Sequence, residues 1–526
     1  MYGISSLLVR GARLYPDKMA AADCEKQRSY GELNVRVNKI ANYLLSKGFT
    51  KGSRVGFICD NCVEFVEMWL ATQKIGLVAV MFNFRAGTEE LARDVRRAAC
   101  DVLFYSPKWQ QTIAARDRTG SPVRLYLSFG GSEAADHVNL ERICEECPEA
   151  EPEAELRETD WSCILFTSGS TGLAKGVVRT HRMTMEYAMQ MAAEHEFYRT
   201  EPVCILSHSP LFHTGGLSML LKALALGGSY IGINGLRGET VGRLIEQYKA
   251  TQLFLVPPVN IMRLAADEEF KRHDLSSINF IWATGGKLSA EYVQKMLELF
   301  PGARIKTSYG GTEFCAACSI SYCLEPQEVQ AKHRLLDSAG VVGLFCEVRL
   351  VDEDGNDAAP GELGEVWVRS PFVMLEYLDD PQETAQVLSD GWYRTGDVFR
   401  MDENGYLYFA DRKSAMIKSG GENIYPNEVE MVLRDCPGVQ DCAVLACPDE
   451  KWGEAVAAAI VPDAQGFSLD SLKAYAAENL AGFRKPRYYL VVDELPKTGS
   501  GKTDRKALGN REKYTFAPLE YDTKKE

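Results

Sequence analysis

The sequence predicts an α/β protein with two domains. We expect a large N-terminal domain of mainly parallel sheets flanked by helices, with a small antiparallel sub-barrel, and a small α+β C-terminal domain. A chain of 526 residues is too long for one ordinary hydrophobic core. Strand patterns alternate with helical patterns along most of it, which is typical of parallel sheets. After Gly361 the pattern changes to short strands separated by turns.

The first helix has a clear start signal. Ser29 and Glu32 stand at the spacing of a capping box, in which each side chain bonds the backbone of the other. Gly48 is placed to end the helix. The apolar residues between them fall on one helical face: Leu33, Val37, Ile40 and Leu44.

The alternation continues beyond this helix. Short apolar runs bounded by turn residues predict strands at 54–59, 77–82, 163–166, 204–207, 230–233, 253–256, 278–282 and 305–308. Helical periodicity predicts helices at 63–73, 239–248 and 290–300. The acidic segment 145–160 contains two prolines and is expected to be a solvated loop.

The last part of the chain has its own pattern. Residues 362–368 suggest antiparallel strands. Beyond them we expect a helix at 427–435, strands at 443–446 and 455–461, a helix at 469–480 and a strand at 488–492. We therefore place the domains at 1–411 and 412–526.

Composition excludes several classes of protein. Hydrophobic residues make up 46% and charged residues 25%, as in soluble globular proteins. The formal net charge of −14 argues against a nucleic-acid partner, because phosphate binding needs a basic face. We find neither the apolar core of a signal peptide nor a run of about 18 apolar residues, so we expect no membrane span and a cytoplasmic location. The oligomeric state is not determined, and a homodimer stays open.

The cysteines also fit a reducing compartment. The chain has 15, an odd number, spread along its length. Three C-x-x-C pairs occur, and a zinc or redox site is one interpretation of them: Cys59/Cys62, Cys144/Cys147 and Cys315/Cys318. No histidine completes a compact four-ligand set, so we favour scattered buried thiols.

A Gly-rich stretch follows the strand expected at 163–166. Its glycines allow backbone N–H groups to turn toward one point, where hydroxyls and an ammonium add further donors. Such a loop binds an anion; a flexible surface turn is the alternative. It is not the P-loop of nucleoside triphosphatases, because Gly-Lys-Ser/Thr does not follow at the required spacing. The candidate anion-binding residues are Thr167, Ser168, Gly169, Ser170, Thr171, Gly172 and Lys175.

Of four further motifs, the segment 418–430 is longer and more specific than the other three. The segment 309–313, Tyr-Gly-Gly-Thr-Glu, follows a strand end, where open α/β sheets bind ligands, but an ordinary turn has the same composition. Asp397 follows a Gly turn and is equally suited to capping a helix. The segments 418–430 and 496–505 each hold glycines and a lysine, and a loop lysine is usually a solvated charge.

Together, in this order and at these intervals, the motifs resemble the signatures of the adenylate-forming superfamily. It contains acyl- and aryl-CoA synthetases, peptide-synthetase adenylation domains and beetle luciferases. The resemblance extends from about Tyr30 to Lys506. Two departures are visible: Ala174 stands where the family usually has Pro, and Glu376 where it usually has Gly.

The resemblance implies a nucleotide site and its co-substrate ATP. The Gly-rich loop would hold the pyrophosphate end, Glu313 would help to hold Mg²⁺, and Thr312 would contact the α-phosphate. Lys502 would bridge the carboxylate and the α-phosphate. Asp397 would bind the ribose with Arg412 nearby. The adenine would lie between segments 285–287 and 308–309, so the remaining nucleotide-binding residues are Gly286, Lys287, Ser308, Tyr309 and Gly310.

The resemblance also favours the acyl-CoA synthetase branch. His213 stands where amino-acid-activating domains carry an Asp for the substrate ammonium. The acyl pocket would be lined by Phe212, His213, Trp282, Thr284, Gly311 and Phe314. CoA would be bound by Lys418, Gly420, Gly421, Trp452, Phe483, Lys485 and Arg487. For the cluster of Arg484, Lys485 and Arg487, an ordinary basic surface patch is the alternative.

In this family the C-terminal domain is mobile and rotates between half-reactions. The pivot lies two residues after the Arg of an Asp-Arg motif, which places it at Ser414. The resemblance thus implies an ATP-dependent carboxylic acid–CoA ligase for a hydrophobic fatty, alicyclic or aryl acid. One alternative is an adenylating enzyme that loads a separate carrier protein, and another is a non-catalytic acyl- or nucleotide-binding regulator. The sequence does not identify the acid.

Overall fold

The computed structural model describes residues 3–84, 88–114, 122–130, 137–167, 174–194, 202–322, 324–463, 466–496, 503–510, 512–519 and 521. The chain packs as two compact units. The first comprises 1–348 and 368–393, and the second comprises 349–367 and 394–526. The domain boundary predicted between 411 and 412 stays a prediction.

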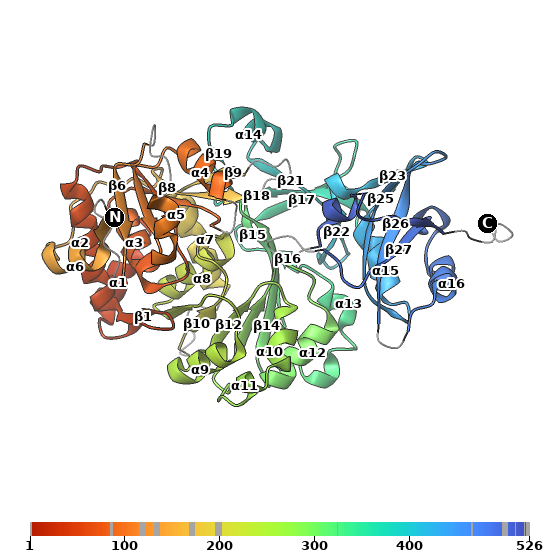
Figure 1. Ribbon diagram of the computed structural model, residues 1–526, viewed down its shortest axis with the longest axis horizontal. Helices are drawn as coiled ribbons and strands as arrows, with labels where there is room; N and C mark the ends of the chain where they lie inside the picture. Colours follow the sequence, from red (N-terminus) through yellow and green to blue (C-terminus); the bar gives the residue numbers. More distant parts are fainter. Residues whose placement is uncertain are drawn as a thin grey trace. The chain divides into compact units, whose positions relative to one another are not determined.

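The first unit contains two sheets that are mainly parallel, as predicted (Figure 1). Among the described residues, one sheet has the strand order β16 (Val341–Val342), β15 (Cys315–Tyr322), β14 (Arg304–Gly311), β13 (Phe280–Ala283), β12 (Gln252–Leu255), β10 (Cys204–Ser207), β11 (Ser229–Gly232), β1 (Met19–Ala22) and β2 (Gln27–Ser29). The other has the order β19 (Glu376–Tyr377), β9 (Lys175–Thr180), β8 (Trp161–Thr167), β4 (Val78–Met81), β3 (Arg54–Ile58), β5 (Val102–Tyr105), β6 (Leu125–Ser128) and β7 (His137–Asn139).

Helices connect and cover these strands. They are α1 (Ser5–Leu14), α2 (Tyr30–Ser46), α3 (Val63–Lys74), α4 (Thr88–Arg97), α5 (Gln110–Ala114), α6 (Leu140–Glu146), α7 (His181–Ala193), α8 (Thr214–Ala225), α9 (Gly238–Tyr248), α10 (Asn260–Ala266), α11 (Glu268–Lys271), α12 (Ala290–Leu299), α13 (His333–Leu336) and α14 (Pro381–Val387). Helix α7 packs on β8 and β9, α8 packs on β10 and β11, and the two helices contact each other. They therefore fill the space between the two sheets (Figure 1).

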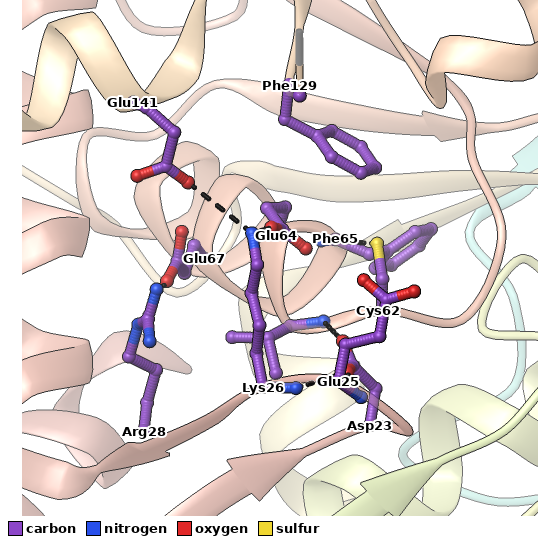
Figure 2. A network of polar contacts seen from close by, with 12 residues as sticks. Asp23, Glu25, Lys26, Arg28, Cys62, Glu64, Phe65, Glu67, Phe129 and Glu141 are labelled. Carbon is purple, nitrogen blue, oxygen red and sulfur yellow. Dashed lines mark hydrogen bonds and ion pairs between the residues drawn. The ribbon is translucent and has the colours of Figure 1, made fainter.

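An ion-pair network ties the β1–β2 hairpin to helix α3 (Figure 2). Glu64 and Glu67 of α3 are buried, Lys26 pairs with Glu64, and Arg28 pairs with Glu67 at 3.1 Å. Burial raises the pKa of the Glu67 carboxyl, and Arg36 offsets this with a 2.6 Å contact. Burying a charge without a partner costs much free energy. Each of these buried carboxylates has a cationic partner, which offsets that cost.

The second unit is α+β, as predicted, and most of its strand pairs are antiparallel. Most of a curled sheet lies in it, with β17 (Glu347–Val351), β18 (Leu363–Arg369), β21 (Trp392–Met401) and β22 (Leu407–Arg412); β21 also pairs with β20 (Leu388–Ser389). A further sheet contains β24 (Glu422–Ile424), β23 (Ile417–Ser419), β26 (Gly453–Pro462), β25 (Val439–Asp449), β27 (Tyr488–Val491) and β28 (Ala517–Pro518). The helices are α15 (Pro426–Arg434), α16 (Leu469–Asn479) and α17 (Arg505–Leu508).

Within the described residues, no helix has both the length and the apolar character needed to cross a membrane. No group of three or more His, Cys, Asp and Glu side chains in that part of the chain is arranged to hold a metal ion. The described cysteines are free thiols, most of them buried.

Candidate active site

The two ends of the Gly-rich loop are fixed by a β-hairpin. Thr167 ends β8, Lys175 begins β9, and the two residues are antiparallel partners. The Thr167 hydroxyl also donates to the carbonyl oxygen of Lys175 at 3.4 Å. The predicted anion-binding residues Ser168, Gly169, Ser170, Thr171 and Gly172 lie outside the described residues.

Lys175 has two partners that sequence reasoning missed. Its ammonium group pairs with the Glu383 carboxylate and lies 5.0 Å from the centre of the Tyr377 ring. Both partners are about 200 residues further along the chain, and β19 brings them close by pairing with β9. Local sequence carries no signal for such a long-range contact.

Thr312 and Glu313 occupy the tight turn between β14 and β15. A Cβ at Gly310 would lie 1.8 Å from the carbonyl oxygen of Cys315, so only glycine permits this close approach. The Tyr377 hydroxyl donates to Oε1 of Glu313 at 3.0 Å. Burial, together with the Glu313 carboxylate, raises the pKa of Tyr377, so its hydroxyl stays protonated as the donor. Tyr377 therefore joins the Lys175 end of the Gly-rich loop to the Thr312–Glu313 turn.

Arg179 of β9 supports the same turn from inside the protein. It is buried, and its guanidinium donates to the carbonyl oxygen of Thr312 at 2.6 Å and contacts Sγ of Cys315. Sequence analysis did not single out this residue; an arginine directly after the apolar pair Val177 and Val178 is the signal that was available.

Replacing Arg179 by methionine is expected to slow adenylate formation about tenfold, because the carbonyl of Thr312 loses its donor and the turn loosens. The rate is measured by pyrophosphate release, beside the melting temperature. Arg179→Lys should recover part of the rate. Arg182→Met, at an exposed position of α7, serves as the control. An Arg179→Met enzyme that melts earlier but keeps the parent rate below its melting temperature would assign Arg179 to stability alone.

Three of the predicted pocket and nucleotide residues contact one another. Trp282 lies in β13, Thr284 directly after it, and Ser308 in β14. The Trp282 ring nitrogen donates to Oγ of Ser308 at 3.0 Å. The Thr284 hydroxyl donates to the carbonyl oxygen of Ser308 at 2.7 Å. The orientation of the Trp282 ring is therefore set by hydrogen bonding as well as by packing.

Each of the other predicted pocket residues either has an aromatic ring next to another ring or lies beside a ring. The rings of Phe212 and His213 have centroids 4.4 Å apart, just before α8. Phe314 lies 5.4 Å from the Tyr309 ring, and a Cβ at Gly311 would be 2.6 Å from the Phe314 ring. Near the predicted adenine segments, Gly286 precedes Lys287, and the Lys287 ammonium pairs with Asp337 at 2.9 Å.

Two buried lysines behind Trp282 were also missed. The ammonium of Lys306 lies 4.4 Å and that of Lys222 5.5 Å from the centre of the Trp282 ring. Lys306 pairs with Glu194, and Lys222 donates to Gln252 at 2.8 Å. Burial, with Lys306 nearby, lowers the pKa of Lys222 well below its usual range. A lone lysine within the apolar sequence of α8 was the available signal.

In the second unit, Asp397 and Arg412 are partners across β21 and β22. Nε of Arg412 lies 3.1 Å from Oδ1 of Asp397. Asp397 is buried and Arg412 is exposed, so the guanidinium orients a carboxylate that is itself largely shielded from water. The predicted ribose-binding pair is thus brought together within this unit.

Several residues of the predicted CoA segments contact one another within the second unit. Gly420 and Gly421 form the turn between β23 and β24, both with positive φ, and a Cβ at Gly420 would lie 2.5 Å from the Trp452 ring. The guanidinium of Arg487 lies 5.9 Å from the centre of the Trp452 ring. The remaining members are exposed Lys418 and Phe483, and Lys485 near the Tyr521 ring.

Of the predicted hinge residue and the predicted catalytic lysine, only the hinge residue lies among the described residues. Ser414 is exposed in a single 3₁₀ turn, Lys413–Ala415, directly after β22. Lys502 lies outside the described residues.

Comparison with known proteins decides the family. The sequence model of the AMP-binding enzyme family matches residues 8–378, and that of the AMP-binding enzyme C-terminal domain matches residues 428–502. The chain belongs to the AMP-binding enzyme family. This confirms the resemblance to the adenylate-forming superfamily that the loop motifs indicated.

Several relatives of this AMP-binding enzyme are acid–CoA ligases by name. Feruloyl-CoA synthase of Amycolatopsis sp. is 34% identical over 502 residues, which cover 95% of this chain and 97% of the relative. Long-chain-fatty-acid–CoA ligase FadD13 of Mycobacterium tuberculosis is 30% identical and covers 98% and 99%. The solved structure of the amide bond synthetase McbA from Marinactinospora thermotolerans aligns with a TM-score of 0.84 at 28% identity, covering 96% and 99%.

Proposed function

We propose that this AMP-binding enzyme is an ATP-dependent carboxylic acid–CoA ligase for a hydrophobic fatty, alicyclic or aryl acid. The observation that carries the proposal is that Lys175 and Glu313 both contact Tyr377. Its ring lies beside Lys175 at the end of the Gly-rich loop, and its hydroxyl holds the Glu313 carboxylate. The Lys175 ammonium and a carboxylate suited to a divalent cation thus both contact Tyr377.

The chemistry needs such an arrangement. A free carboxylate is a poor acyl donor because its leaving group would be oxide. Its attack on the α-phosphorus of ATP forms an acyl-adenylate and releases pyrophosphate, and a thiol can then displace AMP. Negative charge accumulates in the first step, so donors aimed at it stabilise the transition state. We assign the pyrophosphate end to segment 167–175, the α-phosphate to Thr312 and Lys502, and the ribose to Asp397.

The residues present suit a magnesium ion. Mg²⁺ in nucleotide sites is bound by one or two carboxylates together with phosphate oxygens. Glu313 offers a half-buried carboxylate whose Oε1 is oriented by Tyr377. Bound there, Mg²⁺ would supply charge neutralisation at the phosphates. The protein itself orients Glu313 and keeps the Tyr377 proton in place.

The alternative acceptor is a thiol on a separate carrier protein. The gathering of Gly420, Trp452 and Arg487 favours free CoA, because a guanidinium and an aromatic face suit its phosphates and its base. We further propose a cytoplasmic location, supported by the free thiols of the described cysteines. If the purified protein retains CoA and an Arg487→Ala variant does not, the acceptor is free CoA rather than a carrier-protein thiol.

A pyrophosphate-release screen tests the proposal. The panel contains short, medium-chain and long-chain fatty acids, alicyclic acids and aryl acids, each with ATP, Mg²⁺ and CoA. We expect at least one apolar acid to give release that depends on both the acid and ATP. If no acid gives pyrophosphate release, the result would favour a non-catalytic acyl- or nucleotide-binding role instead.

We expect α-amino acids to be poor substrates. The predicted pocket contains His213 but no carboxylate to pair with an ammonium, and burying an unpaired ammonium is costly. The measurement is kcat/KM for phenylalanine against its deaminated counterpart 3-phenylpropanoate. An amino acid activated better than every fatty or aryl acid would contradict this expectation.

A further inference from the structure

One of the three C-x-x-C pairs brings its sulfur atoms together. Cys59 directly follows β3, Cys62 is the N-cap of α3, and the two Sγ atoms are 3.6 Å apart. Cys315 and Cys318 lie instead on the extended strand β15, where three residues span about 10 Å. Cys144 and Cys147 lie in α6 and at its C-cap, and in the described part of the chain no sulfur–sulfur hydrogen bond joins either of these two pairs.

The two sulfur atoms differ in access and in partners. Cys59 is buried and accepts a hydrogen bond from the Ser106 hydroxyl at 3.3 Å. Cys62 is half-buried, and its Sγ accepts the backbone N–H of Phe65 at 3.4 Å (Figure 2). Since the Cys62 residue is partly exposed and Cys59 is buried, we assign the first attack on a small oxidant to Cys62 and the resolving step to Cys59.

Asn61, between the two cysteines, links them to the segment that precedes the predicted acyl pocket. Its side-chain amide donates to the carbonyl oxygens of Ser209 at 2.9 Å and Ile233 at 3.0 Å. Its Oδ1 accepts the backbone N–H of Leu211 at 2.8 Å. Leu211 directly precedes Phe212 and His213. A movement of the Cys59–Cys62 turn would therefore displace these residues through the Asn61 side chain.

We propose that Cys59 and Cys62 are a redox-active dithiol whose oxidation to a disulfide displaces Asn61 and loosens the 209–213 segment. The coupling to catalysis rests on the proposed function; the disulfide and the loosening do not. Closing the bridge requires the sulfur atoms to approach from 3.6 Å to a bonding distance of about 2.05 Å. The intervening residues Asp60 and Asn61 have to absorb that movement.

The reaction balances with a peroxide as the oxidant. The Cys62 thiolate attacks one peroxide oxygen, which gives a sulfenic acid and, after protonation, one water. The Cys59 sulfur then displaces the hydroxyl of that sulfenic acid, which forms the S–S bond and a second water. Burial raises the pKa of the Cys62 thiol, so little thiolate is present at neutral pH and the pair reacts slowly unless oxidant is in excess.

The first experiment maps the disulfide. The purified full chain is treated with excess hydrogen peroxide, its free thiols are alkylated, and peptides are analysed by mass spectrometry. We expect a Cys59–Cys62 bridge that forms before any bridge within Cys144/Cys147 or Cys315/Cys318 and that dithiothreitol reverses. Alkylated Cys59 and Cys62 in a folded protein whose other cysteines have oxidised would overturn the proposal.

The second experiment tests the coupling to the 209–213 segment. Oxidation should speed hydrogen exchange of the Leu211 amide roughly five- to tenfold, as expected for losing one side-chain hydrogen bond. Cys62→Ser is the control, because a hydroxyl keeps the N-cap but forms no bridge. An unchanged Leu211 amide in the disulfide form would refute the coupling. A parallel fall in acyl-CoA formation, absent in Cys62→Ser, is expected; if the reduced enzyme has no such activity, the proposed function fails while the exchange result still stands.

Discussion

Replacing Lys502 by alanine is expected to slow adenylate formation by about 10²–10³, the usual scale for losing one transition-state charge contact. Thioester formation from a preformed acyl-adenylate should survive largely intact, because the thiol step no longer needs charge at the attacking carboxylate. The measurement is single-turnover kinetics of each half-reaction on the purified variant.

Lys497→Ala is the matched control, since it removes a lysine from the same Gly-flanked segment. We expect it to keep both half-reactions near the parent rates. Equal losses of both half-reactions in Lys502→Ala would mean that the residue is structural or serves both steps.

Replacing Ser414 by proline is expected to keep adenylation and to abolish most thioester formation. Proline fixes φ near −65°, which a 3₁₀ turn accommodates at Ser414, and it restricts Lys413 as well. If Ser414 is the pivot, the C-terminal domain is then held in the orientation that serves Lys502, and the rotation that presents Gly421 to the thiol is blocked. Single-turnover kinetics of both half-reactions measure the effect, and circular dichroism confirms folding.

Ser414→Ala is the control for this variant, because it removes the same hydroxyl and leaves φ free. It should run both half-reactions at the parent rates. A folded Ser414→Pro enzyme that does the same would place the pivot elsewhere or show that no such rotation is needed.

Local sequence signals were sufficient wherever a short segment determines its own structure. The capping box of Ser29 and Glu32 is confirmed, with the Ser29 side chain accepting from the backbone of Glu32 and the Glu32 side chain accepting from that of Ser29. Alternating strand and helix patterns also predicted the α/β architecture. These features depend on neighbours a few residues apart, which a sequence shows directly.

Features set by distant partners were predicted less well. The strand predicted at 305–308 extends from Arg304 to Gly311, because β15 pairs antiparallel with it through the Gly-Gly segment. Composition alone indicated a turn there. Glu376, where a glycine was expected, lies in β19 opposite Val178, an extended position that accepts any side chain.

The candidate site shows the same division. The loop motifs identified Thr312 and Glu313, but not Arg179 and Tyr377, which hold them from other strands. Nor did the C-x-x-C spacing show which of three pairs is close in space. Only Cys59 and Cys62 lie across a strand-to-helix turn, and that turn is a property of the fold.

Transfer of labelled oxygen tests the central claim of acyl-adenylate chemistry most directly. The best acid from the screen is labelled with ¹⁸O in its carboxylate and converted with ATP and CoA. If the carboxylate attacks the α-phosphorus, each AMP carries one ¹⁸O, the pyrophosphate carries none, and acyl-CoA forms in equal amount to AMP. Unlabelled AMP beside acyl-CoA, or ¹⁸O in inorganic phosphate, would contradict the account.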